Sequence, residues 1–497
     1  MVFHLLSERK IDSLLLKSLK TKLKKPIISV ILPVYCAEDH VAEAIESVVN
    51  QTIGIEKIQL LLIDDGSTDS SPEICKHYAQ LYPDSIFYYR KENGGVSSAM
   101  NLGLSLAKGK YIARLDSDDT WDPKAFAEVV SFFDKHYSEI DCLSVKINIF
   151  GDLHYNHPLN FKYTKNRIID LKKEPYCIQT TTNNAIYKAK ALKGLSYNEK
   201  IHYMEDVYFN TQFLRTRLKY GVISTTRYNF RKVVDKETLS NKIQFNRKWY
   251  FENPYEVLFP LINVSKEIFG KTDRYTQSVI AYFLRWRIPP IGINETLNKD
   301  EIEKYTGIIH QLLQEIDDDV ISSIKGTLFL HRNFLYRLKY QRDLFEIAEL
   351  DQKGRYRLNG NVIFNACGSS LARIDKVEIV NSKAVVSGAS SLLQAGDRCS
   401  LHAEDMAGNT IPMEVVANPE ANIYGFNGEV ILKAAAFRIV FPEAYISAFR
   451  MYTKLKDQPG KYYCTVSFGP KVRGTFSQES GVELENTGVK CITTFGN

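Results

Sequence analysis

The sequence predicts an α/β protein that continues into a helical middle region and a C-terminal antiparallel β-sandwich. Three observations support this order. Apolar runs in the first 120 residues alternate with helix patterns and short connections, as in parallel sheets. Apolar residues then recur at helical spacing from about residue 249. From about residue 368, short strand-like runs are separated by Gly, Asn and Pro turns at the spacing of an immunoglobulin-like sandwich.

Length and composition agree with several globular domains. The chain has 497 residues, with 44% hydrophobic and 25% charged residues, and exceeds the size of one ordinary core. Its net charge of +6 is small for this length and does not predict nucleic-acid binding. Eight scattered cysteines without a CxxC pair are typical of reduced thiols in a cytoplasmic protein. No run of 18 apolar residues predicts a transmembrane helix.

The chain begins with a basic amphipathic leader. In residues 1–25, leucine and isoleucine recur at helical spacing among Lys and Arg residues. Two alternatives stay open: a helix that lies on an anionic membrane leaflet, or a helix that packs on the protein's own body. The predicted regions are the leader at 1–25, a sheet domain at 26–248, a helical region at 249–367 and a β-sandwich at 368–497.

Four apolar runs predict the strands of the sheet domain. The run at 26–35 is rich in β-branched residues, as expected of a strand that is buried on both faces. No GxGxxG follows it, which argues against a dinucleotide-dependent enzyme. The other strands are predicted at 58–63, 86–89 and 111–115, and the helices at 41–50, 71–82 and from a glycine turn at 93–95 to about 107.

The fourth strand ends in three carboxylates within four residues, Asp116, Asp118 and Asp119. Like charges at this spacing raise one another's pKa, whereas a divalent cation such as Mg²⁺ or Mn²⁺ would stabilise them. Such a cation can also hold a diphosphate leaving group. The alternative is a solvated turn before the next helix. Asp64 and Asp65 follow the second strand in the same way, so all these side chains are expected at the sheet edge where ligands bind.

These motifs resemble family-2 glycosyltransferases of the GT-A fold. The resemblance covers about residues 26–240 and rests on Pro33-Val34-Tyr35, Asp64-Asp65-Gly66-Ser67, Asn93 to Asn101 and Asp116-Ser117-Asp118-Asp119. It implies a nucleotide-sugar donor, usually a UDP-sugar, and an inverting displacement at the anomeric carbon. It assigns Asp118 as the metal ligand and implies that the donor is bound by Pro33, Tyr35, Asp64, Asp65, Asn93, Ser97 and Asp116.

A catalytic base is predicted at the start of a later helix. Inverting transfer needs a base for the acceptor hydroxyl, opposite the leaving diphosphate. Glu205-Asp206 precedes an apolar-periodic helix at 207–214, where the two carboxylates could equally cap that helix. The resemblance implies that Asp206 is the base. A polar segment at 177–187 is predicted as a strand, which similar enzymes place beneath the acceptor.

Positive charge for the leaving diphosphate is predicted after the base. Tyr228-Asn229-Phe230-Arg231-Lys232, followed by Ser240, resembles the segment that closes over the diphosphate in teichoic-acid and capsule transferases. Arg231 would give a bidentate phosphate contact and Lys232 a point charge. A basic pair on the surface without such a role is the alternative.

The sequence therefore predicts an inverting glycosyltransferase that depends on Mn²⁺ or Mg²⁺. Its donor would be a UDP-sugar, and its acceptor a polymer or lipid-linked glycan for teichoic acid, capsule or lipooligosaccharide. The expected location is the cytoplasm, with peripheral contact to the inner face of the membrane. The β-sandwich would oligomerise or contact polymer, or would precede a further domain in a longer bifunctional protein. The alternative function is a catalytically weak glycan-binding or scaffolding protein of a polymer-assembly complex.

Overall fold

The computed structural model divides into two compact units, and the division falls after Phe283. This point lies inside the region 249–367 that the sequence predicts as one helical region. Among the described helices, none has both the length and the apolar character needed to cross a membrane. The structure describes residues 25–233, 243–324, 329–342, 344–351, 355–365, 372–381, 383–390, 399–417, 423–432, 435–441, 448–455, 461–467 and 482–483. The predicted leader at 1–25 therefore lies outside the described residues, except for Lys25.

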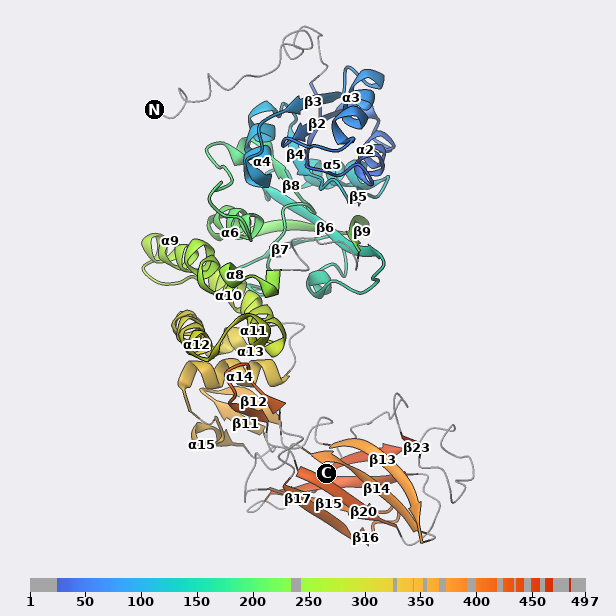
Figure 1. Ribbon diagram of the computed structural model, residues 1–497, viewed down its shortest axis with the longest axis vertical. Helices are drawn as coiled ribbons and strands as arrows, with labels where there is room; N and C mark the ends of the chain where they lie inside the picture. The colour runs from blue at the N-terminus through green and yellow to red at the C-terminus, as the bar shows by residue number, and fades with distance from the viewer. Residues whose placement is uncertain are drawn as a thin grey trace. The chain divides into compact units, whose positions relative to one another are not determined.

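The first unit is built on a mixed sheet of nine strands between residues 28 and 232, in the order β3-β2-β1-β4-β8-β6-β9-β5, with β7 paired to β9 (Figure 1). As predicted, the first four strands are parallel to one another. β8 runs antiparallel to both β4 and β6, which makes the sheet mixed. The strands are β1 (Ile28–Val34), β2 (Ile58–Asp64), β3 (Ile86–Arg90), β4 (Tyr111–Arg114), β5 (Thr120–Trp121), β6 (Cys142–Gly151), β7 (Arg167–Asp170), β8 (Ala185–Lys188) and β9 (Lys219–Lys232).

Helices on the faces of this sheet bury its apolar runs. α4 packs against β1 and β2, α5 packs against β9, and α2 packs against α3 (Figure 1). Every residue of β2 is buried, as expected of a strand that is covered on both faces. The helices of this part are α2 (Val41–Val49), α3 (Ser71–Leu81), α4 (Gly95–Leu106), α5 (Ala125–Lys135) and α6 (Glu205–Arg217), with short 3₁₀ turns at Ile55–Lys57, Pro158–Lys162 and Ala189–Leu192.

The register of the parallel strands brings their carboxyl ends to one edge. Val34 pairs with Asp64 across β1 and β2, and Ile31 pairs with Arg114 across β1 and β4. The turns that follow β1, β2 and β4 therefore leave the sheet side by side. This is the edge at which parallel α/β sheets bind ligands.

The predicted strand at 177–187 is wrong over most of its length. Only β8, which begins at Ala185, is a strand, and residues 177–184 form a loop. The polar side chains explain the difference, because Gln179 and Asn184 hydrogen-bond to each other and to nearby backbone carbonyls. Such side-chain bonds compete with the ladder of a sheet.

The helical middle region ends earlier than the sequence suggests. Within the region predicted as helical at 249–367, α14 ends at Tyr340, and the short α15 is followed by a three-stranded antiparallel sheet, β10-β11-β12. The elements here are α8 (Arg247–Phe251), a π-helical turn (Pro254–Leu258), α9 (Phe259–Phe269), α10 (Arg274–Arg287), α11 (Pro290–Thr296), α12 (Lys299–Gln314), α13 (Asp318–Ser323), α14 (Phe329–Tyr340), α15 (Leu344–Ile347), β10 (Glu349–Leu350), β11 (Arg355–Leu358) and β12 (Asn361–Asn365), after a 3₁₀ turn at Ile243–Phe245.

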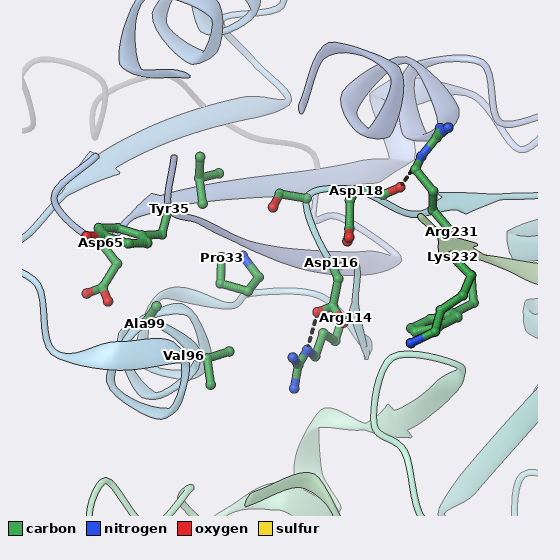
Figure 2. Close-up of a pocket in the computed structure, with 13 residues that line it drawn as sticks. Pro33, Tyr35, Asp65, Val96, Ala99, Arg114, Asp116, Asp118, Arg231 and Lys232 are labelled. Atoms are coloured by element: carbon green, nitrogen blue, oxygen red, sulfur yellow. Dashed lines mark hydrogen bonds and ion pairs between the residues drawn. The ribbon is translucent and has the colours of Figure 1, made fainter. Parts of the chain in front are cut away.

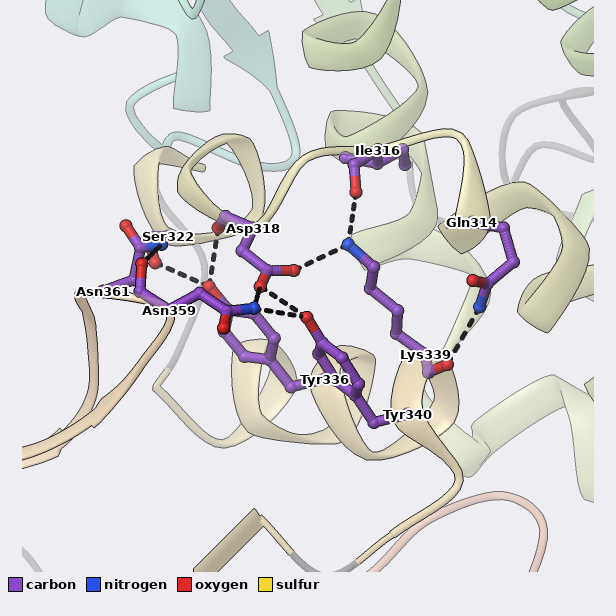
Figure 3. Close-up of polar contacts among 9 residues, drawn as sticks. All are labelled: Gln314, Ile316, Asp318, Ser322, Tyr336, Lys339, Tyr340, Asn359 and Asn361. Atoms are coloured by element: carbon purple, nitrogen blue, oxygen red, sulfur yellow. Dashed lines mark hydrogen bonds and ion pairs between the residues drawn. The ribbon is translucent and has the colours of Figure 1, made fainter. Parts of the chain in front are cut away.

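One carboxylate joins the helices of the second unit to this small sheet. Asp318, at the start of α13, accepts hydrogen bonds from Lys339 and Tyr340 of α14 and from Asn359 between β11 and β12 (Figure 3). The Tyr336 hydroxyl donates to the Asp318 carbonyl at 2.6 Å. These bonds lower the pKa of Asp318 although burial opposes the shift. The cluster therefore explains the packing of α13, α14 and the hairpin.

Two antiparallel sheets form the C-terminal part, as predicted. Their orders are β17-β20-β14-β13-β23 and β16-β15-β21-β22. Apolar side chains from both sheets, such as Phe437 and Phe449, form one buried cluster, which makes the pair a sandwich. The strands are β13 (Ala372–Val380), β14 (Lys383–Ser390), β15 (Cys399–Glu404), β16 (Thr410–Ile411), β17 (Met413–Ala417), β20 (Ala435–Val440), β21 (Ala448–Leu455), β22 (Lys461–Ser467) and β23 (Val482–Glu483), with a separate hairpin of β18 (Ile423–Tyr424) and β19 (Val430–Leu432).

Two helical glycines give a test of this packing. A Cβ atom at Gly103 of α4 would lie 2.3 Å from Ile31 Cγ2 of β1, whereas a Cβ at Gly307 of α12 would meet nothing within 4 Å. We expect Gly103→Ala to lower the free energy of unfolding by about 1–3 kcal/mol through overpacking. Gly307→Ala should raise it by about 0.4–1 kcal/mol, because alanine reduces the entropy of the unfolded chain. Urea unfolding followed by tryptophan fluorescence measures both, and a Gly103→Ala protein as stable as the wild type would contradict the packing of α4.

Candidate active site

A pocket of about 340 Å³ opens at the carboxyl edge of the first sheet (Figure 2). This volume is within the range of small-molecule sites. Acidic and basic side chains both line it, so a polar, charged ligand fits it better than an apolar one. The lining residues are Pro33, Val34, Tyr35, Asp65, Val96, Ala99, Arg114, Asp116, Ser117, Asp118, Phe230, Arg231 and Lys232.

Arg114, the last residue of β4, connects the acidic loop to the start of α6. Its Nε donates to Asp116 Oδ1 at 2.6 Å (Figure 2), and one of its terminal nitrogens lies 3.4 Å from Glu205 Oε1. Although burial opposes its charge, these two carboxylates hold the pKa of Arg114 well above its usual value. Arg114 is therefore a permanent cation that lines the pocket.

Hydrogen bonds from β9 hold the loop that follows Asp116. The Tyr228 hydroxyl donates to Asp119 Oδ2 at 2.7 Å, and the Arg231 backbone N–H donates to Asp119 Oδ1 at 2.7 Å. Burial, together with Asp118 and Asp116, raises the pKa of Asp119 well above its usual value. Of the three carboxylates in the predicted run, Asp119 is thus a buried structural group, and the other two line the pocket.

The two predicted phosphate-binding cations differ in their surroundings. The Arg231 guanidinium donates to the Asp118 carbonyl at 2.9 Å, pairs with Glu43 of α2 and lies 4.4 Å from the Phe150 ring centre. Figure 2 shows Arg231 and Lys232 on the side of the pocket that carries Asp118. Burial lowers the pKa of Lys232, which Asp118 partly opposes.

Asp206 lies in the first turn of α6, next to this charged cluster. Burial and the neighbouring Glu205 raise the pKa of its carboxyl group to about 8, while Arg114 opposes that shift. Its Oδ1 accepts a hydrogen bond from the Val207 backbone N–H at 2.7 Å. A carboxylate with a pKa near neutrality, coupled to a pocket-lining cation, has the properties of a general base.

The acidic pair at the end of β2 holds the turns around the pocket. Asp65 lines the pocket and accepts hydrogen bonds from the Gly94 and Gly95 backbone N–H groups at the start of α4, at 3.0 and 2.7 Å. Lys91 lies 2.6 Å from the same carboxylate. Asp64 is fully buried, is bonded by the Tyr88 hydroxyl at 2.6 Å, and does not line the pocket.

The remaining predicted donor residues lie beside the pocket or outside the described chain. Asn93 is exposed in the turn before α4. Ser97 is buried one residue after the pocket-lining Val96, and its hydroxyl oxygen has no hydrogen-bond partner in the described part of the chain. Ser240 lies outside the described residues.

Sequence reasoning missed the contacts that join distant segments. No motif in the sequence points to the contact of Arg114 with Thr182 Oγ1 at 3.2 Å, or to Asn183 Nδ2, which lies 3.4 Å from Asp116 Oδ2. An arginine at the end of an apolar strand was the available signal, because a buried charge needs partners. The polar loop at 177–184 carried no comparable pattern.

The donor chemistry at this edge fits a divalent cation that is bound together with a phosphate ligand. In the described part of the chain, no three His, Cys, Asp or Glu side chains are grouped closely enough to hold a metal by themselves. Mg²⁺ sites often use only one or two carboxylates and complete the shell with substrate phosphates and water. Asp118 and Asp116 supply such carboxylates at the pocket.

Comparison with known proteins identifies a family and relatives that are similar in sequence. The model of glycosyl transferase family 2 matches residues 29–195. The minor teichoic acid biosynthesis protein GgaB of Bacillus subtilis is 32% identical over 84% of this chain and 47% of GgaB. GgaA of the same organism, also a minor teichoic acid biosynthesis protein, is 31% identical over 63% of this chain and 71% of GgaA. The chain thus spans about half the length of GgaB.

Solved structures show the same fold at low sequence identity. Staphylococcus aureus TarS has a TM-score of 0.54 at 14% identity, over 89% of this chain and 83% of that chain. Residues 1–349 of TarS, in a crystal structure with UDP-GlcNAc, have a TM-score of 0.50 at 17% identity, over 67% of this chain and 97% of that chain. The family match covers the ends of β1, β2 and β4, which line the pocket together with the end of β9 outside the matched range, and GgaA is similar over most of its own length. This chain therefore belongs to glycosyl transferase family 2.

Proposed function

We propose that this chain is an inverting, metal-dependent glycosyltransferase that moves a sugar from a UDP-sugar to a hydroxyl group of a bacterial surface polymer. The observation that carries this proposal is the pocket in which Asp116 and Asp118 lie near Arg231 and Lys232, with Asp206 coupled to it through Arg114. The names of GgaB and GgaA favour teichoic acid over capsule or lipooligosaccharide. The UDP-GlcNAc complex of TarS supports a UDP-sugar donor.

The nucleoside would bind along the ends of β1 and β2. Tyr35 exposes 56% of its surface and offers an aromatic face to a base, next to Pro33. Asp65, which the backbone at the start of α4 holds in place, would accept a hydrogen bond from the base. Asp64 is buried and would contribute by holding the turn after β2. Ser97 is buried beside the pocket and its hydroxyl has no partner among the described residues, so it would have to turn toward the pocket to reach the nucleoside.

The diphosphate would lie between the acidic loop and the end of β9. Asp118, with Asp116 beside it, would hold Mn²⁺ or Mg²⁺, which when bound supplies positive charge to the leaving diphosphate. Lys232 would add a point charge to the same phosphates. Arg231 would first have to exchange its contact with Glu43 for phosphate, and in either state its bond to the Asp118 carbonyl positions the metal ligand.

Asp206 would take the proton of the acceptor hydroxyl as that oxygen attacks the anomeric carbon opposite the diphosphate. Because burial and Glu205 raise its pKa to about 8, its carboxylate is a stronger base than an ordinary aspartate. The cytoplasmic location, the peripheral contact with the membrane and the oligomerisation through the β-sandwich remain predictions from the sequence.

Release of UDP from a panel of UDP-sugars tests the proposed function directly. We expect metal-dependent release from one donor, which EDTA abolishes and added Mn²⁺ or Mg²⁺ restores, because the ion stabilises the leaving diphosphate. Asp118→Asn should need far more metal for the same rate. If the wild-type protein binds glycan but releases no UDP from any donor, the glycan-binding or scaffolding alternative is favoured.

Replacement of the proposed base separates catalysis from binding. Asp206→Asn should lower kcat by about 10²–10⁴-fold, as expected for the loss of a general base, while the dissociation constant for UDP stays unchanged. The exposed Asp84 of the same unit gives the control variant Asp84→Asn, which should keep full activity. Near-normal turnover by Asp206→Asn would refute the assignment.

The pH dependence of kcat/KM reports the ionisation of Asp206 in the free enzyme. The base works only when deprotonated, and its pKa is about 8, so kcat/KM should rise with pH and level off above that value. Glu205→Gln removes the adjacent negative charge that raises this pKa, and should move the rise to lower pH. An unchanged pH profile in Glu205→Gln would show that another group controls the rate.

A further inference from the structure

Lys162 is a buried lysine that contacts the loop at 177–184 and has no role in the proposed reaction so far. Lys162 is 2% exposed, and its ammonium donates to the Ile178 carbonyl at 2.6 Å and to Gln179 Oε1 at 2.8 Å. The ring centres of Tyr163 and Tyr220 lie 5.2 and 5.3 Å away. None of these partners is a carboxylate, and burial lowers the pKa of Lys162 to about 7. Burying an ammonium group is unfavourable unless other interactions compensate, so the two hydrogen bonds to the loop at 177–184 must offset part of that cost.

These hydrogen bonds continue through two amide side chains. Gln179 Nε2 donates to the Thr181 carbonyl at 2.8 Å and to Asn184 Oδ1 at 2.7 Å. Asn184 Nδ2 in turn donates to the Val145 carbonyl of β6 at 2.6 Å and to the Tyr163 hydroxyl oxygen at 3.0 Å. The loop at 177–184 is thus held by side chains in place of a strand ladder, and Lys162 donates the hydrogen bonds at its base.

The tip of this loop reaches the candidate active site. Thr182 Oγ1 accepts a hydrogen bond from Arg114 at 3.2 Å, and Asn183 Nδ2 donates to Asp116 Oδ2 at 3.4 Å. The Asn184 backbone N–H donates to Asn183 Oδ1 at 2.9 Å, which fixes the amide group that faces Asp116. The position of the tip therefore depends on the same Asn184 that the buried network holds.

We propose that Lys162 is a positioning residue for the transfer reaction: through Gln179 and Asn184 it fixes Thr182 and Asn183 against Arg114 and Asp116. This inference rests on the proposed function. Arg114 and Asp116 are the residues that couple the donor pocket to Asp206, so a displaced tip alters the geometry of the reacting groups while the nucleoside pocket along β1 stays intact. The alternative is a lysine that stabilises the fold and does not affect the reaction.

Lys162→Met tests the proposal, because methionine fills the space and removes both hydrogen bonds. We expect kcat for sugar transfer to fall by about 10²-fold, which is the scale of a displacement of about 1 Å in an active site. The affinity of the variant for UDP should match that of the wild type. The midpoint of urea unfolding shows whether the variant is folded when kcat is measured. Lys193→Met, at an exposed lysine of the same unit, is the control that should keep wild-type activity. If Lys162→Met does not fold, Gln179→Leu breaks the same connection.

A double-mutant cycle distinguishes positioning from a general loss of stability. Replacing Thr182 and Asn183 together by alanine removes both contacts with Arg114 and Asp116, so Lys162→Met should cause little further loss of kcat in that background, as expected of residues that act through the same contacts. Losses that multiply, or a folded Lys162→Met protein with wild-type kcat, would overturn the inference and leave the proposed function standing. A wild-type protein that releases no UDP from any donor would overturn the proposed function, and the inference with it.

Discussion

The candidate site depends on the ion pairs of Arg114. This residue ends β4, lies 2.6 Å from Asp116 and 3.4 Å from Glu205, and so joins the acidic loop to the first turn of α6. Without its charge, Asp116, Glu205 and Asp206 would be three carboxylates in partly buried positions with mutual repulsion. With it, residues about 90 positions apart in the chain form one site.

The acidic run after β4 serves both folding and chemistry. Asp119 turns inward, where Tyr228 and the Arg231 backbone bind it, and this attaches the loop to β9. Asp116 and Asp118 are thereby left at the pocket, on the side where β9 also ends in Arg231 and Lys232. The spacing of three carboxylates in four residues thus combines one buried anchor with two side chains available to a ligand.

Much of the fold was predictable because it follows local patterns. The apolar runs of β1 to β4 and the motifs at their ends indicated the parallel part of the sheet, and seven of the predicted site residues line the same pocket: Pro33, Tyr35, Asp65, Asp116, Asp118, Arg231 and Lys232. The loop at 177–184 was not predictable, since its Thr residues favour a strand and only contacts with Lys162 and Tyr163 decide otherwise. The role of Arg114 also depends on its contact with Glu205 of α6, and no local pattern reveals a contact between residues so far apart in the chain.

A crystal structure of the protein with UDP and Mn²⁺ would show whether the residues joined by Arg114 form one site. We expect an anomalous Mn²⁺ peak beside the Asp118 carboxylate, the diphosphate next to that peak and facing Lys232, and Asp206 on the side of the sugar site that is opposite the diphosphate. UDP bound at another surface, or UDP in the pocket with Asp206 turned away from it, would show that these residues do not form the donor site.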